Sequence, residues 1–179
     1  MVCLLCLPMM MQAEEHNYVS TSQQQDAFVL SAYGKSAKIL VADDDWKGVL
    51  RAAQDLSSDV RRVTGVESEV ESVSLSVSKK RSTVPCYHQS VIVGTLGKSS
   101  LVDGLVKKGI IKVDDIKGQW ESYVIQSDGN NLYVVGSDKR GTIYGIYDIS
   151  EKIGVSPWYW WADVPAKKAS ALYILRYPE

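Results

Sequence analysis

Three adjacent polar residues, Asp138, Lys139 and Arg140, stand where a short strand should give way to a helix. The β-branched and aromatic run of residues 132–135 stops at Gly136, as a strand covered by a helix should. Ligand sites of α/β domains lie where helix N-termini and open loops meet at strand ends, so Arg140 could hold a carboxylate through two parallel hydrogen bonds. The alternative is an Arg–Asp pair that only locks the loop.

A second group of candidate binding residues follows the same helix. Trp158, Tyr159, Trp160 and Trp161 stand in a row after Ser156-Pro157, which blocks continuation of the helix. So dense an aromatic cluster is not ordinary surface. Flat rings with polar edges can stack on sugar faces, and the same residues also anchor domain interfaces and cores.

The remaining reactive side chains form no acid–base pair, catalytic triad or metal set. Asp148 and Glu151 are three residues apart on one helix and are expected to face solvent, and Asp163 has no obvious acidic partner. His16 and His88 are isolated in polar stretches, without the spacing of a Ser-His-Asp or metal site. We therefore expect no catalytic residue, no metal and no cofactor in this chain.

Two further motifs resemble ligand sites but favour structural roles. Asp43, Asp44 and Asp45 precede a helical pattern, so helix capping by an Asp is favoured over binding of a divalent cation. The GTLGKSS segment, residues 94–100, has too few residues between its first glycine and Gly-Lys-Ser for a phosphate loop. It is expected to join a strand to a helix capped by Ser99 or Ser100.

The elements that position these residues alternate between strands and helices. Helical periodicity spans residues 46–64 and 142–153, with Ser137 or Asp138 as N-cap of the second helix and Gly154 as its left-handed C-terminal residue. Strands are expected at residues 28–30, 38–41 and 91–93, within 66–77, and as a hairpin of 120–125 with 132–135. The pattern predicts the α/β class: a small two-layer or sandwich domain with a mixed sheet of four to six strands and two main helices.

Length and composition allow one domain. The chain has 179 residues, of which 45% are apolar, enough for a single core. Residues 1–13 resemble a secretory signal, too short to span a membrane, residues 14–26 are expected to be a flexible lead-in, and residues 27–179 a single α/β domain. We therefore expect a secreted or periplasmic protein.

Charge and cysteine content exclude further classes. The net charge of −1 and a single basic triplet, residues 79–81, disfavour a nucleic-acid partner. Removal of the signal would leave Cys86 as the one cysteine, so that folding would rely on packing and not on an internal disulfide.

The strings GSDKRGTIYGIYD and GVSPWYWWADVP resemble the N-terminal domain of glycoside hydrolase family 115, the xylan α-1,2-glucuronidases. The resemblance runs from about residue 28 to residue 177 and includes AAQDLSSDVRRVTG and VIVGTLGKSSLVD. It implies the small α/β domain that precedes the catalytic barrel in several exo-acting glycosidases. It also implies that the acid and base of hydrolysis stand on a (β/α)8-type barrel, which begins just after a segment similar to residues 171–177.

On this resemblance, the chain is expected to be a non-catalytic N-terminal domain, or a truncated product, of a secreted α-glucuronidase that removes (4-O-methyl)glucuronic acid from glucuronoxylan. The chain alone is expected to be inactive, with the barrel downstream as its partner and a xylan-derived oligosaccharide as a second candidate partner. Arg140 could then hold a uronate carboxylate, but the Arg–Asp pair that locks the loop is favoured. Packing of the aromatic cluster against the barrel is favoured over contact with sugar. The alternative is a free-standing carbohydrate-binding or protein-interaction module with the same fold.

Overall fold

The structure is a computed structural model that describes residues 17–74, 89–159 and 161–176. Its main sheet has five strands in the order β5-β4-β6-β8-β7. Four of them run parallel and β7 pairs antiparallel with β8, so the sheet is mixed, as predicted. The strands are β4 (Lys38–Ala42), β5 (Val70–Val73), β6 (Ser90–Thr95), β7 (Tyr123–Ser127) and β8 (Asn131–Gly136).

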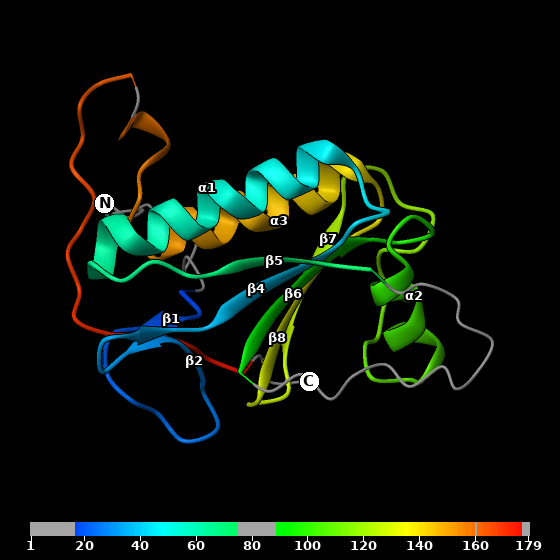
Figure 1. The fold of residues 1–179 in the computed structure, drawn as a ribbon, viewed down its shortest axis with the longest axis horizontal. Coiled ribbons are helices and arrows are strands. Elements are labelled where there is room, and N and C mark those ends of the chain that lie inside the picture. The colour runs from blue at the N-terminus through cyan, green and yellow to red at the C-terminus, as the bar shows by residue number, and fades with distance from the viewer. Residues whose placement is uncertain (1–16, 75–88, 160, 177–179) are drawn as a thin grey trace, which may run out of the picture.

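Helices cover both faces of this sheet (Figure 1). α1 (Lys47–Thr64) and α3 (Lys139–Lys152) lie side by side on one face, and α2 (Ser100–Lys107) covers part of the other. Successive residues of β4 alternate between the two layers, since Ile39 belongs to the core under α1 and α3 and Leu40 to the core under α2. Burial on both faces explains why the central strands read as continuous apolar runs.

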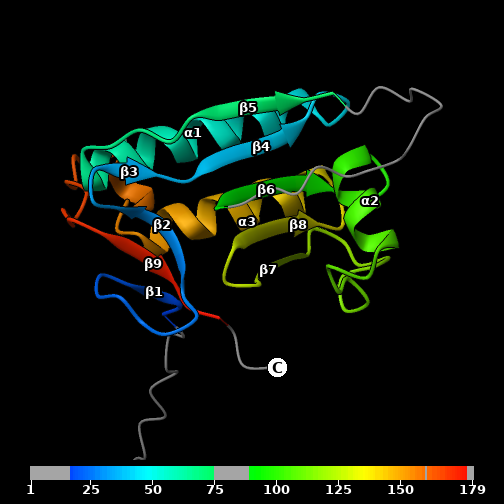
Figure 2. The ribbon, with the colours of Figure 1, turned by 60° about the horizontal axis from the view of Figure 1, so that its bottom comes forward.

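A second, smaller sheet lies beside the first, in an arrangement that the sequence did not predict (Figure 2). Its antiparallel strands follow the order β1-β9-β2-β3. They are β1 (Val19–Ser20), β2 (Phe28–Ala32), β3 (Lys35–Ser36) and β9 (Leu172–Ile174). Phe28, Leu30 and Leu172 are buried in the same core as α1 and α3, so the two ends of the described chain close the domain together.

The local signals for helix ends are confirmed for α2 and α3. Ser99 caps α2, Asp138 caps α3, and Gly154 after α3 adopts a φ of 111°. The predicted Asp cap of α1 is wrong: the N-cap residue is Trp46, without a side-chain hydrogen bond. Asp45 cannot serve as the cap, because its carboxylate is occupied by other backbone N–H groups.

Several strand predictions change in detail. The strands predicted on either side of the Tyr33-Gly34 turn belong to two different sheets, because β2 pairs with β3 at the turn and β4 enters the main sheet. The hairpin of β7 and β8 is confirmed, but Trp120 precedes it. In the segment expected to be a flexible lead-in, residues 14–26, Tyr18 is buried and β1 forms.

Other predictions fall on residues that the structure does not describe: the signal at residues 1–13, the basic triplet at 79–81, Cys86, His16, His88 and Trp160. Among the described residues, no helix combines the length and the apolar character that crossing a membrane requires.

Candidate functional site

The carboxyl ends of β4, β6 and β8 lie together at one end of the strands of the main sheet, where all three helices begin. The chain leaves β4 toward β5 on one side, whereas β6 leads to β8 on the other. The space between β4 and β6 is thus the switch point where α/β sheets commonly bind ligands. In this protein the chain's own carboxylates fill it: Asp45 Oδ2 accepts the Thr95 N–H at 2.8 Å, and Asp44 Oδ1 accepts the Ser100 N–H at 3.2 Å.

Asp44 and Asp45 therefore hold neighbouring loops together by accepting hydrogen bonds from backbone N–H groups. Asp45 Oδ1 also accepts the N–H of Trp46 at 2.6 Å, so one carboxylate joins the start of α1 to the end of β6. Burial raises the pKa of Asp45, and the hydrogen bonds from Trp46 and Thr95 lower it by less, so the pKa lies above its usual value. Lys98 lies 5.1 Å from the Trp46 ring, a cation–π contact across the same loops. Among the residues that the structure describes, no group of three or more His, Cys, Asp or Glu side chains could hold a metal ion.

Asp138 holds two segments together at the start of α3. Its Oδ1 accepts the N–H of Gly141 at 2.8 Å, and its Oδ2 accepts the N–H of Glu121 at 2.9 Å. These two hydrogen bonds, led by that of Gly141, hold the pKa of Asp138 below its usual range. The side chain is thus both a helix cap and a clamp on the loop that precedes β7.

Arg140 strengthens the same clamp from the outside. Its Nη1 lies 2.6 Å from Oε1 of Glu121, and the side chains are 71% and 37% exposed. The predicted loop lock therefore exists, with Glu121 in place of an Asp. An exposed pair of this kind contributes little to stability, and Arg140 keeps further guanidinium N–H groups at the surface. The end of the Lys139 side chain instead lies next to Gly48 of α1.

Glycines in the GSDKRGTIYGIYD string allow α3 to lie directly on the hairpin. A Cβ added at Gly141 would stand 2.2 Å from the backbone oxygen of Ser122, and one at Gly136 would stand 2.0 Å from the backbone nitrogen of Thr142. A Cβ at Gly145 would come within 3.0 Å of the Tyr123 ring. The string thus encodes close backbone contact around the Asp138 clamp.

The aromatic cluster lies in a protruding arm after α3, drawn in orange to red in Figure 1. The short 3-10 helix Pro157–Tyr159 opens the arm, and Trp158 and Trp161 are 64% and 85% exposed. Such exposure of two large apolar rings is typical of an interaction surface.

Tyr159 anchors this arm to α1. The guanidinium of Arg62 lies 5.1 Å from the centre of the Tyr159 ring, and its Nη1 lies 2.6 Å from Oδ1 of Asp59. Asp59 is 5% exposed, and burial raises its pKa, while the hydrogen bond and charge of Arg62 oppose the rise. Lys168 from the far side of the arm donates a hydrogen bond to the backbone oxygen of Arg62. The arm therefore has a rigid base.

The two groups of predicted site residues do not form one site. Asp138, Lys139 and Arg140 begin α3, whereas Trp158 and Trp161 follow its end. A helix of 14 residues is about 20 Å long, so the groups lie at opposite ends of the domain.

An open groove of about 620 Å³ runs along β7, and two of its lining residues are Asp128 and Asp148. Asp148 is half-buried in the wall of this open groove and Glu151 is exposed, and Oδ2 of Asp148 accepts the hydroxyl of Tyr18 at 2.6 Å. Asp128 Oδ2 accepts the hydroxyl of Tyr133 at 2.7 Å, and its Oδ1 accepts the N–H of Asn131 at 2.6 Å. Both carboxylates act as acceptors, so neither is arranged to protonate a leaving sugar oxygen.

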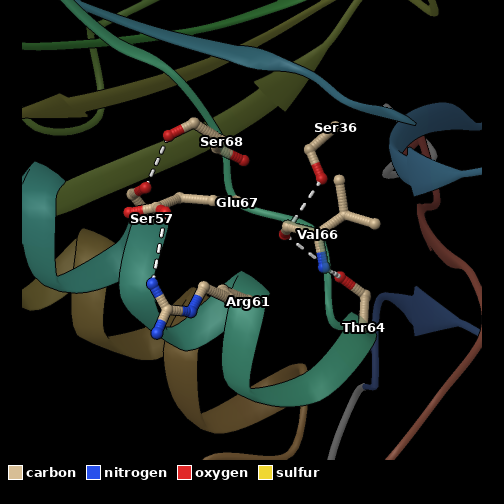
Figure 3. A network of polar contacts seen from close by, with 7 residues as sticks. All are labelled: Ser36, Ser57, Arg61, Thr64, Val66, Glu67 and Ser68. Atoms are coloured by element: carbon tan, nitrogen blue, oxygen red, sulfur yellow. Dashed lines mark hydrogen bonds and ion pairs between the residues drawn. The ribbon is translucent and has the colours of Figure 1, made fainter. Parts of the chain in front are cut away.

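A polar network at the other edge of the sheet has a structural role (Figure 3). Ser57 donates to the backbone oxygen of Ser68, and Arg61 pairs with Glu67 at 3.3 Å, so α1 is joined to the chain that leads into β5. The neighbouring shallow hollow, of about 470 Å³, is lined by Ser57, Ser68 and other polar residues.

The sequence analysis did not single out Trp120, which is 88% exposed on the loop held by Asp138. It was assigned to a strand because it precedes a β-rich run. Tyr18 and Tyr123 also escaped notice, since their shared groove forms only when the N-terminal segment, β7 and α3 come together.

Comparison with known proteins finds similar folds among solved structures. No family model and no curated protein sequence matches the chain. Among solved structures, the fold is similar to a family GH115 4-O-methyl-α-glucuronidase, BtGH115A, which is described as specific for decorated arabinogalactans. The TM-score is 0.65 and the sequence identity 29%, over 85% of this chain and 18% of that enzyme. The chain is therefore similar to one small part of a GH115 glucuronidase.

Proposed function

We propose that this chain is a non-catalytic N-terminal domain of a larger, secreted α-glucuronidase of the family 115 type. The observation that carries the proposal is the alignment of 85% of this chain with only 18% of such an enzyme. Asp128 and Asp148 in the β7 groove already accept hydrogen bonds from tyrosine hydroxyls of the chain, which supports a role outside the chemical step. The whole enzyme would remove (4-O-methyl)glucuronic acid from a plant polysaccharide, with glucuronoxylan as the proposed substrate and decorated arabinogalactan as the competing one.

The aromatic arm is the surface on which we expect a catalytic barrel to rest. Trp158 and Trp161 offer exposed apolar area on a base fixed by Arg62 and Tyr159. Large aromatic residues on a preorganised support are typical anchors of protein interfaces, because little side-chain freedom is lost on contact. This arrangement favours packing against a protein surface over weak stacking on sugar.

Two measurements test the proposal. Incubation of the 179-residue chain with aldouronic oligosaccharides should release no glucuronic or 4-O-methylglucuronic acid, whereas a longer polypeptide that continues into a barrel should release it. Clear turnover by the chain alone would refute the non-catalytic assignment. A longer polypeptide that folds but does not act on either polysaccharide would refute the assignment to an α-glucuronidase.

The aromatic arm has a separate test. Under the interface interpretation, xylan oligosaccharides should leave the tryptophan fluorescence of the isolated chain almost unchanged. A saturable change that disappears in Trp158→Ala would favour a free-standing carbohydrate-binding module instead.

A further inference from the structure

The groove along β7 has the size of a ligand site. Its volume of about 620 Å³ lies within the usual range of about 300–1,000 Å³ for small-molecule sites. β7 is the outermost strand on its side of the main sheet (Figure 2). Asp128 donates its N–H toward β8, to the backbone oxygen of Asn131. Because an antiparallel ladder alternates, the backbone groups of Ile125 and Ser127 are directed outward, to the groove.

Tyr123 gives this groove a fixed aromatic surface. Its ring is packed against α3 at Gly145, where an added Cβ would come within 3.0 Å of ring carbons. The residue nevertheless stays 36% exposed. A ring that is already held by the protein loses little freedom when a flat ligand stacks on it.

Polar groups around the ring can both donate and accept hydrogen bonds. Asp148 accepts the Tyr18 hydroxyl through Oδ2, which leaves acceptor capacity on Oδ1. Arg176 lines the same groove from the end of the small sheet and supplies guanidinium donors. Gln126 is held in place by Lys112, with its Oε1 accepting the Lys112 N–H at 3.2 Å. Gln126 points to the α2 side of β7 and Tyr123 to the α3 side, so the acceptor and donor that the site offers to a ligand on Tyr123 are those of Asp148 and Arg176.

The charges around the groove, taken over both faces of β7, favour an uncharged ligand slightly over an anionic one. Its lining holds two cations, Lys112 and Arg176, and three carboxylates, those of Asp115, Asp128 and Asp148, a net charge of −1. An anionic ligand such as a uronate would meet this net negative charge. Sugar hydroxyls carry no charge and can donate to the carboxylates while accepting from Arg176.

We propose that this groove binds a neutral stretch of a polysaccharide, with a pentose or hexose ring on Tyr123 and hydroxyl groups bonded to Asp148 and Arg176. The kind of polymer rests on the proposed function, but the site does not depend on the catalytic step. The groove would hold the chain of the substrate away from its uronate branch. It lies apart from the aromatic arm, because neither Trp158 nor Trp161 lines it.

Calorimetric titration of the 179-residue chain tests this site, with xylohexaose and a β-linked galactohexaose as neutral probes and a methylglucuronate-substituted xylo-oligosaccharide as the charged one. We expect saturable binding of at least one neutral probe. The affinity should fall at least tenfold in Tyr123→Ala and in Arg176→Gln. The second variant changes an exposed side chain that is not part of the core. The control Trp158→Ala/Trp161→Ala should bind as the wild type does.

Three results would overturn the proposal: no saturable binding of either neutral probe, loss of binding in the Trp158→Ala/Trp161→Ala control while the groove variants bind normally, or binding confined to the charged probe. Far-UV circular dichroism of each variant separates loss of binding from loss of fold. The proposed function has an independent readout, the release of uronic acid by the longer polypeptide, so each idea can fail without the other.

Discussion

Replacement of Asp138 by alanine should measure how much one side chain contributes to holding α3 on the hairpin. The substitution removes the acceptors of the Gly141 and Glu121 N–H groups, at 2.8 and 2.9 Å. Loss of an N-cap residue costs about 1 kcal/mol, and loss of a second backbone hydrogen bond about 1 kcal/mol more. We therefore expect a loss of about 2 kcal/mol in the free energy of unfolding, or a fall of about 4–8 °C in Tm.

Urea unfolding followed by tryptophan fluorescence is a suitable assay, and Asp138→Asn is the matched control. Asparagine keeps an oxygen at the cap and caps helices about as well as aspartate, so its cost should stay below about 1 kcal/mol at neutral pH. A cost for Asp138→Ala below about 0.5 kcal/mol would mean that the clamp does not stabilise the fold.

The same residue predicts a pH dependence. The pKa of Asp138 is lowered in the folded state, so its carboxylate stabilises the protein above the ordinary aspartate pKa. This contribution is lost as the pH falls toward the lowered value. Stability of the wild type should therefore decline on acidification more steeply than that of Asp138→Asn, and parallel declines would contradict the assignment.

The remaining predictions concern the base of the arm and the glycines of the helices. Arg62→Ala leaves Asp59 buried without its cation and should lower the free energy of unfolding, measured in urea, by about 2–3 kcal/mol. The loss is smaller than for a fully buried pair because the Arg62 side chain is 27% exposed. Burial raises the pKa of Asp59, so wild-type stability should fall as the pH rises from the ordinary aspartate pKa through the raised one, and Asp59→Asn should flatten that slope. Gly141→Ala should cost about 2–3 kcal/mol, because its Cβ would stand 2.2 Å from a backbone oxygen. In Gly48→Ala the new Cβ meets the flexible Lys139 side chain and, at an ordinary contact distance of 3.5 Å, Cδ1 of Ile143, so stability should change by no more than about 1 kcal/mol. Equal losses for the two glycines would refute the packing argument.

Features set by neighbouring residues were predictable from the sequence. Asp138 lies directly before a helical pattern, Ser99 before another, and Gly154 after the periodic run ends, so each cap follows from local chemistry. The strand β6 was evident from its unbroken apolar run, because both of its faces are covered.

Features set by distant pairs were not predictable. Asp45 has the right position to cap α1, but Thr95, far along the chain, takes its carboxylate. Arg140 was expected to pair with an Asp, and it pairs with Glu121 because the hairpin returns that loop to the start of α3. The groove on β7 depends on Tyr18, which the sequence placed in a flexible segment. A candidate site therefore fails to show in sequence when its parts come from opposite ends of the chain.

The position of β9 has a mechanical consequence. This short strand lies between β1 and β2 and is antiparallel to both, so its hydrogen bonds stand across the direction of the chain. Tension on the chain beyond residue 176 acts along β9, so it would strain the hydrogen bonds to β1 and β2 together, in shear. It would not break them one after another from one end. A pull on the chain beyond residue 176 would therefore be resisted first by the small sheet and by the packing of Leu172 and Ile174 in the core under α1 and α3.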